Sequence, residues 1–168
     1  MRESDSLAHS SAAAQALAER VGVSMWARDH ATQALKMELL RIAPGEAVIR
    51  MPVQQHMLNG HQTCHGGYMF TLADSAFAFA CNSYNLNNVA SACQIDFLAP
   101  AHLGDLLEAH AQERALAGRS GVYDVTVRIV GGATVALFRG KSHQVRGEVT
   151  EGPPGAHTAA MHASHKTA

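Results

Sequence analysis

The chain of 168 residues is long enough for one domain with a hydrophobic core and too short for two ordinary domains. Its 13 Lys and Arg residues balance 14 Asp and Glu residues, and the net charge of -1 argues against the basic surface of a nucleic-acid-binding protein. No apolar run reaches the roughly 18 residues of a transmembrane helix, so we expect no membrane association.

Three widely spaced cysteines, Cys64, Cys81 and Cys93, predict reduced thiols rather than a disulfide framework. The first residues lack the basic start and apolar segment of a secretion signal. Both observations favour a cytoplasmic protein.

The first third of the chain predicts one helix and one hairpin. Residues 1–9 show no clear pattern and are expected to be disordered. A helix is expected from Ser10 or Ser11, both favourable N-cap types, to about Arg28. Alternating apolar residues then predict two antiparallel strands, over residues 32–42 and 46–53.

The remainder predicts a buried helix followed by strands. After a polar loop over residues 54–64, the segment 67–81 is apolar on nearly every side, as in a helix buried all round. Alternation predicts four further strands, over residues 89–100, 105–116, 121–130 and 134–145. Gly131-Gly132 between the last two is a hairpin signal.

A long helix with an antiparallel sheet is an α+β arrangement. A sheet that curls around the helix, together with a second copy of the chain, would bury the helix on all sides. We therefore expect one ordered domain over residues 10–146 and a disordered tail over residues 147–168, which is rich in Gly, Pro, Ala, His and Thr.

The loop contains four side chains that could bind a metal, His56, His61, Cys64 and His65. Their spacing matches no common zinc or haem pattern, so ordinary loop residues are the simpler interpretation and no metal site is expected. No G-x-S-x-G pattern of a nucleophilic serine is present. Cys64 beside His65 is a weak nucleophile candidate because sequence neighbours more often point apart.

Gly66 and Gly67 lie where the loop meets the buried helix. The free N–H groups and the dipole of a helix N-terminus can bind a phosphate or polarise a carbonyl oxygen. Glycines at such a junction also serve simply to form a turn.

Asp74 is a single carboxylate in an apolar helix, where an unpaired charge is costly. It could act as a base or nucleophile, or it could cap a loop or pair with an arginine. It follows Gly66 by eight residues, about 12 Å along a helix, whereas a base must lie within about 3 Å of its target. If both features act on one carbonyl, they must come from two subunits.

The pattern N-G-x4-H-G-G-x4-L-A-D-x-A, from Asn59 to Ala76, resembles the PaaI-type hotdog-fold thioesterases of phenylacetate degradation. The segments VASACQIDFLAPA, GVYDV and TVALFRGKSH carry the same resemblance, which covers about residues 10–146. It implies a strongly bent antiparallel sheet wrapped around a long central helix. It also implies homodimers that pair sheet edge to sheet edge with shared active sites, and commonly a tetramer of two dimers.

The resemblance further implies residue roles. Asp74 matches the catalytic carboxylate, which acts as nucleophile or general base, and Gly66 matches the backbone donor to the thioester carbonyl. His65 and Asn59 match the two polar residues beside it. The candidate substrate contacts are Gly67, Tyr68 (or a core residue), and Arg119, Arg139 and Lys141 for the coenzyme A phosphates, unless these three cations are only solvated.

The expected function is hydrolysis of an aryl- or arylacetyl-CoA, such as a hydroxyphenylacetyl-CoA, to the free acid and CoA. Water is the second substrate, and no cofactor is expected beyond the coenzyme A of the substrate. Two alternatives are a hotdog acyl-CoA hydratase or dehydratase and a non-catalytic acyl-CoA-binding protein. Comparing thiol release with enoyl hydration separates the first, and Asp74 argues against the second because simple binding has no use for a desolvated carboxylate.

Overall fold

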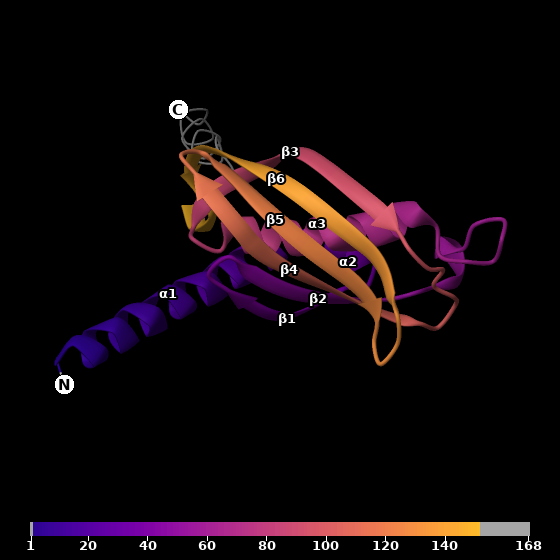
Figure 1. The fold of residues 1–168 in the computed structure, drawn as a ribbon, viewed down its shortest axis with the longest axis horizontal. Helices are drawn as coiled ribbons and strands as arrows, with labels where there is room; N and C mark the ends of the chain where they lie inside the picture. The colour runs from indigo at the N-terminus through magenta and orange to yellow at the C-terminus, as the bar shows by residue number, and fades with distance from the viewer. Residues whose placement is uncertain (1, 152–168) are drawn as a thin grey trace, which may run out of the picture.

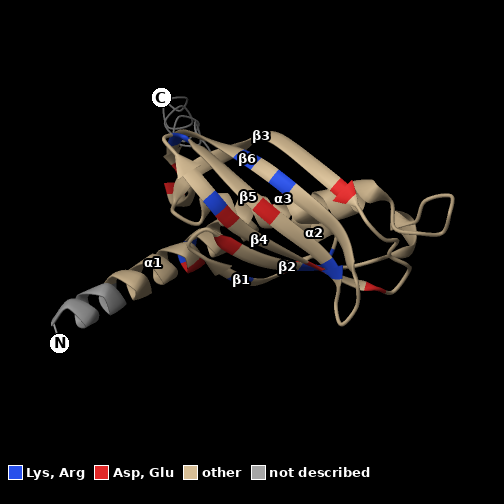
Figure 2. Ribbon diagram, viewed as in Figure 1, with Lys and Arg blue, Asp and Glu red and all other residues tan. Residues whose placement is uncertain are grey.

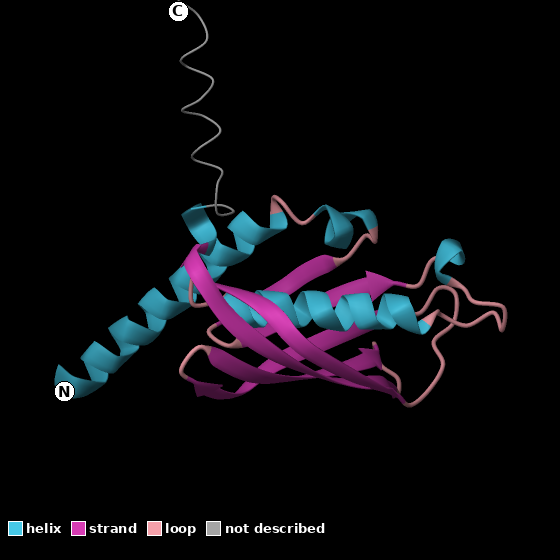
Figure 3. Cartoon of the chain, turned by 90° about the horizontal axis from the view of Figure 1, so that it is seen from above, coloured by secondary structure: helices cyan, strands magenta, loops and turns pink. Residues whose placement is uncertain are grey.

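A six-stranded antiparallel sheet forms the body of the protein, and one long helix lies along its inner face (Figures 1 and 3). The computed structural model describes the backbone of residues 2–151 and the side chains of residues 10–151. The strand order is β1-β2-β4-β5-β6-β3. The strands are β1 (Glu38–Ala43), β2 (Glu46–Pro52), β3 (Leu86–Phe97), β4 (Leu106–Ala117), β5 (Ser120–Ile129) and β6 (Thr134–Glu148). The predicted α+β arrangement is confirmed.

The helices are α1 (Arg2–Trp26), α2 (His30–Ala34) and α3 (Gly66–Asn82), with short 3-10 turns η1 (Gln55–Met57) and η2 (Val149–Glu151). Helix α3 is the expected central helix, and its apolar side packs on the sheet. The ring of Phe77 lies between those of Tyr123 and Phe138, with centroid distances of 5.5 and 5.9 Å. A Cβ at Gly140 would lie 2.9 Å from the Phe77 ring, so this glycine lets α3 approach β6 closely. In the described part of the chain, no helix is long and apolar enough to span a membrane.

The outer face of the sheet is polar. Along β5, Tyr123, Val125 and Val127 are buried under α3, whereas Asp124 and Arg128 point outward, as the alternation predicted. Asp124 accepts hydrogen bonds from Arg139 on β6 (2.6 Å) and Arg114 on β4 (3.0 Å). Acidic and basic positions therefore alternate across neighbouring strands (Figure 2).

Three predicted boundaries were wrong. Helix α1 begins at Arg2, so residues 2–9 belong to it and it does not start at Ser10 or Ser11. The predicted strand over residues 32–42 is helix α2 in its first part, and β1 begins only at Glu38. The cause is Asp29, whose carboxylate caps α2 by accepting a hydrogen bond from the Thr32 N–H at 3.0 Å.

The predicted disordered tail also begins too early, because β6 continues to Glu148 and η2 follows it. The Val149 carbonyl accepts hydrogen bonds from Arg28, which follows α1, at 2.8 Å and from the Ser24 hydroxyl of α1 at 3.5 Å, and these bonds fasten η2 to the end of α1. The rest of the expected tail, residues 152–168, lies outside the described residues.

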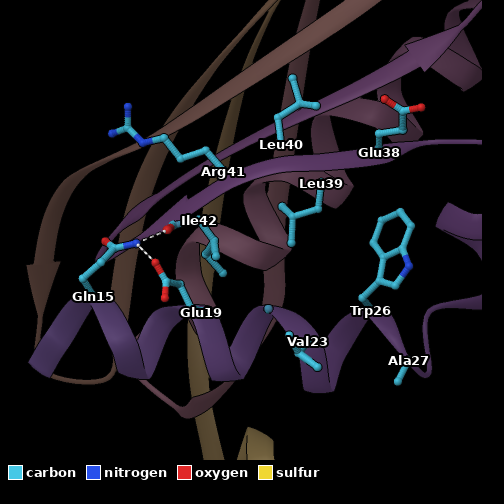
Figure 4. A pocket seen from close by; sticks show the side chains of 11 residues that line it. Gln15, Glu19, Val23, Trp26, Ala27, Glu38, Leu39, Leu40, Arg41 and Ile42 are labelled. Atoms are coloured by element: carbon cyan, nitrogen blue, oxygen red, sulfur yellow. Dashed lines mark hydrogen bonds between the residues drawn. The ribbon is translucent and has the colours of Figure 1, made fainter. Parts of the chain in front are cut away.

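The two edges of the sheet are covered differently. Helix α1 runs beside β1, and the Gln15 amide donates to the Ile42 carbonyl at 2.9 Å (Figure 4). Between α1 and β1 lies a groove of about 740 Å³, lined by Trp26 and Leu39 among others. At the opposite edge, β3 pairs only with β6, and the side chains of Val89 and Phe97 are half exposed. Strand β3 is thus the open edge within the described chain.

Candidate active site

The N-terminus of α3 is built by the loop before it. The N–H of Cys64 donates to the Ala101 carbonyl and that of His65 to the Met57 carbonyl, each at 2.8 Å. His65 is the N-cap, and its Nδ1 accepts a hydrogen bond from the Gly67 N–H at 3.0 Å. The Gly66 N–H has no hydrogen-bond partner among the described residues. Of the two glycines, Gly66 therefore has the N–H that a ligand can use.

Phe97 lies directly against Gly66. A Cβ built on Gly66 would lie 2.8 Å from Cζ of Phe97, closer than real side chains approach. Phe97 is the last residue of β3 and is 52% exposed. The absence of a side chain at Gly66 thus leaves room for the Phe97 ring beside the free N–H.

Asp74 lies two turns further along α3 and is half-buried. Its Oδ1 accepts a hydrogen bond from the Cys93 thiol of β3, with Sγ 3.9 Å away. Burial raises the pKa of Asp74, and the thiol hydrogen bond lowers it by a smaller amount. Among the described residues, neither an arginine nor a backbone N–H binds its carboxylate, so it neither caps a loop nor forms an ion pair there. A carboxylate of this kind can act as a base or a nucleophile.

Asn59 shapes the loop. Its Oδ1 accepts hydrogen bonds from the backbone N–H groups of His61 (2.8 Å) and Thr63 (3.3 Å), and its amide donates to the Thr63 hydroxyl (3.0 Å). These bonds hold the turn that leads into His65. Its predicted place beside the substrate carbonyl stays a prediction.

Tyr68, on the first turn of α3, lies between two histidine rings. Its ring meets those of His56 and His65 edge to face, with centroid distances of 5.9 and 6.5 Å. With His65, Gly67 and Thr71 it lines a hollow of about 380 Å³. Tyr68 is therefore placed at the same helix end as Gly66, as a substrate contact would require.

The three predicted phosphate-binding cations lie elsewhere in the chain. Arg119 donates to the Gln144 carbonyl (2.6 and 3.0 Å), near the strand ends that face the C-terminus of α3. Arg139 pairs with Asp124 on the outer face of the sheet, and Lys141, two residues further along β6, is exposed on that face. Within one chain none of them accompanies Gly66 and Asp74, and their contact with phosphates stays a prediction.

The loop side chains considered as metal ligands do not converge. In the part of the chain that the structure describes, no group of three His, Cys, Asp or Glu side chains could hold a metal ion. Burial raises the pKa of the Cys64 thiol to about 11, so this thiol stays protonated at neutral pH and is a poor nucleophile.

Sequence reasoning missed Cys93 and Phe97 as site residues. Both belong to the strand predicted over residues 89–100, and their odd-numbered positions share one face of it. That face turns toward α3, as the contacts of Cys93 with Asp74 and of Phe97 with Gly66 show. The apolar alternation of the strand predicted that Cys93 and Phe97 share one face. It did not predict which residues of α3 this face would contact.

Comparisons with known proteins identify the family to which the chain belongs. The profile of the family described as "Thioesterase superfamily" matches residues 61–136. The acyl-coenzyme A thioesterase PaaI of Escherichia coli (strain K12) is 50% identical over 127 residues, which are 76% of this chain and 91% of that protein. The chain belongs to the thioesterase superfamily.

Solved structures of other thioesterase-like chains share the fold. The E. coli PaaI protein from the phenylacetic acid degradation operon aligns with a TM-score of 0.78 and 48% identity, over 80% of this chain and 97% of that one. The protein smu.793 of Streptococcus mutans UA159, bound to acetyl CoA, aligns with a TM-score of 0.63 and 25% identity, over 65% and 88% of the two chains. The predicted hotdog fold and the assignment as a thioester hydrolase are thereby confirmed.

Proposed function

We propose that this thioesterase hydrolyses acyl-CoA thioesters with an aromatic acyl group, of the hydroxyphenylacetyl-CoA kind, to the free acid and CoA. The E. coli relative is named an acyl-coenzyme A thioesterase and comes from a phenylacetic acid degradation operon. Coenzyme A is part of the substrate, and the reaction needs no further cofactor. The three free thiols fit a reducing compartment, which supports the cytoplasm as its location.

The observation that carries the proposal is the state of Asp74. It is half-buried, burial raises its pKa, and its hydrogen-bond partner among the described residues is a thiol rather than a cation. Such a carboxylate costs stability and serves no structural purpose that the contacts reveal. A role in the reaction explains why it is there.

The chemistry follows from two groups. The Gly66 N–H donates to the thioester carbonyl oxygen and stabilises the negative charge that develops on it. As general base, Asp74 takes a proton from water while the water oxygen attacks the carbonyl carbon, and the intermediate then expels CoA, whose sulfur receives the proton. If Asp74 is instead the nucleophile, its carboxylate oxygen attacks the carbonyl carbon and forms a mixed anhydride as CoA leaves. Water then hydrolyses that anhydride. Both routes need the same pair of groups.

We infer that the pair is assembled from two subunits joined at β3. Helix α1 lies beside β1, which is only six residues long and carries a bulge, whereas β3 is twelve residues long and pairs on one side only. Strand β3 is therefore the better edge for adding a second sheet. Gly66 lies beside Phe97, and Asp74 lies beside Cys93. An antiparallel pairing of two β3 strands centred near Ile95 sets Phe97 opposite Cys93 of the partner subunit. It thereby brings Gly66 of one subunit to the level of Asp74 of the other.

This dimer explains how one site can use groups about 12 Å apart along a single helix. Two dimers that stack into a tetramer, as the family resemblance implies, stay a prediction. Light scattering of the purified protein gives the number of subunits directly.

The test is a thiol-release assay on aromatic and aliphatic CoA thioesters, with wild type and Asp74→Asn. We expect the aromatic thioesters to be preferred, and Asp74→Asn to lose at least about 100-fold in kcat because it can neither accept a proton nor attack. The control is Glu38→Gln, an exposed carboxylate on β1 at the opposite edge of the sheet, which should keep wild-type activity.

Full hydrolysis by Asp74→Asn would contradict the catalytic role. Binding of CoA thioesters by the wild type without thiol release would identify a binding protein instead. Hydration of enoyl-CoA without thiol release would identify a hydratase.

A further inference from the structure

Cys93 is the side chain that contacts the Asp74 carboxylate from the sheet. It lies near the middle of β3, is half-buried, and its Sγ is 3.9 Å from Oδ1 of Asp74. A thiol is a long and weak hydrogen-bond donor, so it can orient a carboxylate without neutralising its basicity.

The other titratable neighbour of Asp74 is Cys81, on α3 itself. Its thiol donates to the Ala78 carbonyl at 3.5 Å, so its proton is already in use. Burial raises the pKa of Cys81 to about 12, and the charge of Asp74 contributes to the increase. No Lys, Arg or His of the described chain bonds to Asp74, and from β3 only Cys93 does. The thiol of Cys93 is therefore the single tether of this carboxylate in the described structure.

We propose that Cys93 is a positioning residue for Asp74. The Cys93 thiol holds Oδ1 of the carboxylate so that Oδ2 is presented to the substrate. This inference rests on the proposed catalytic role of Asp74. The bond holds the carboxylate from the strand that also forms the proposed dimer edge, and it leaves one oxygen free to take a proton or attack. Without the tether, rotation about the Asp74 side chain would spread the carboxylate over several orientations, and the reaction would lose the benefit of a fixed geometry.

The bond also bears on ionisation, with a definite sign. A donor to the ionised carboxylate favours the charged form, so its removal raises the pKa of Asp74. Because the ionised form is the active one, the acidic limb of the pH profile should then move to higher pH.

The experiment compares Cys93→Ala, Cys93→Ser and the control Cys81→Ala in the thiol-release assay across pH. For Cys93→Ala we expect the acidic limb of kcat/KM to move up by about half to one pH unit, and kcat to fall about 3- to 10-fold. Cys93→Ser keeps a hydrogen-bond donor. The acidic limb of its kcat/KM profile should therefore lie at or below the wild-type pH, and its kcat should be close to that of the wild type. Cys81→Ala should leave both unchanged.

A thermal melt of each variant shows whether it folds. If Cys93→Ala does not fold, Cys93→Val replaces it, because valine is close to cysteine in size and has no hydrogen-bond donor. If Cys93→Ala leaves the acidic limb of kcat/KM and kcat unchanged, the proposal is overturned. It is also overturned if Cys93→Ser and Cys93→Ala lose the same amount of activity, because equal losses indicate a packing role rather than a hydrogen bond. The outcome for Asp74→Asn separates the two claims. If that variant is inactive while Cys93→Ala behaves as wild type, only the positioning role fails.

Discussion

In the proposed site Gly66 and Asp74 have different roles, one through its backbone and the other through its side chain. The imidazole of His65 occupies the Gly67 N–H, and this leaves the Gly66 N–H as the donor at the start of α3. The position is crowded by a contact rather than restricted by backbone conformation, since the nearest obstacle to a Cβ is the end of the Phe97 ring. Asp74 is half-buried at a cost that its proposed reactivity explains.

Gly66→Ala should therefore damage activity more than stability. The added methyl group meets the end of a half-exposed ring that can move aside, so the fold should lose little. The methyl group and the displaced ring would crowd the carbonyl, and we expect kcat/KM to fall about 10- to 100-fold. Thiol release and a thermal melt measure the two effects. Gly60→Ala, where a Cβ would meet nothing within 4 Å, is the control, and equal losses in both variants would contradict the assignment.

At the scale of elements, helices and strands that depend on a long run of residues were predicted well, whereas an element that depends on a single contact was not. The four later strands and α3 were expected within about three residues of their observed bounds, because alternation and an apolar helix extend over ten or more positions. Helix α2 was mistaken for a strand because its identity depends on one cap, Asp29 to Thr32. The roles of Gly66 and Asp74 stay predictions from the resemblance. The contact of Cys93 with Asp74 could not be predicted, since strand alternation does not specify which residue of α3 a strand residue faces.

The cap on α2 gives a prediction at this scale. Asp29→Ala removes the acceptor for the Thr32 N–H and should lower the free energy of unfolding by about 1 kcal/mol. Asp29→Asn keeps an acceptor oxygen and should retain most of that stability. Chemical denaturation measures both, and an alanine variant as stable as the asparagine variant would show that the cap does not hold α2.

At the scale of the whole molecule, the two edges of the sheet differ: β1 is short and lies beside α1, whereas β3 is long and pairs only with β6. Helix α1 lies along β1, and the polar outer face carries paired charges, so the long strand β3 is the place where a second copy can extend the sheet. Two chains joined there would each supply half of two sites. The central claim is that Gly66 and Asp74 of one site belong to different subunits.

Mixing two strongly impaired variants tests this claim most directly. A heterodimer of Asp74→Asn and Gly66→Ala would contain one site with both groups intact and one site with both altered. After unfolding together and refolding at equal amounts, half of the dimers would be mixed and each would have one working site, so thiol release should recover to about one quarter of the wild-type rate. A mixture no more active than the average of the two separate variants would show that each site lies within one chain and would contradict the account.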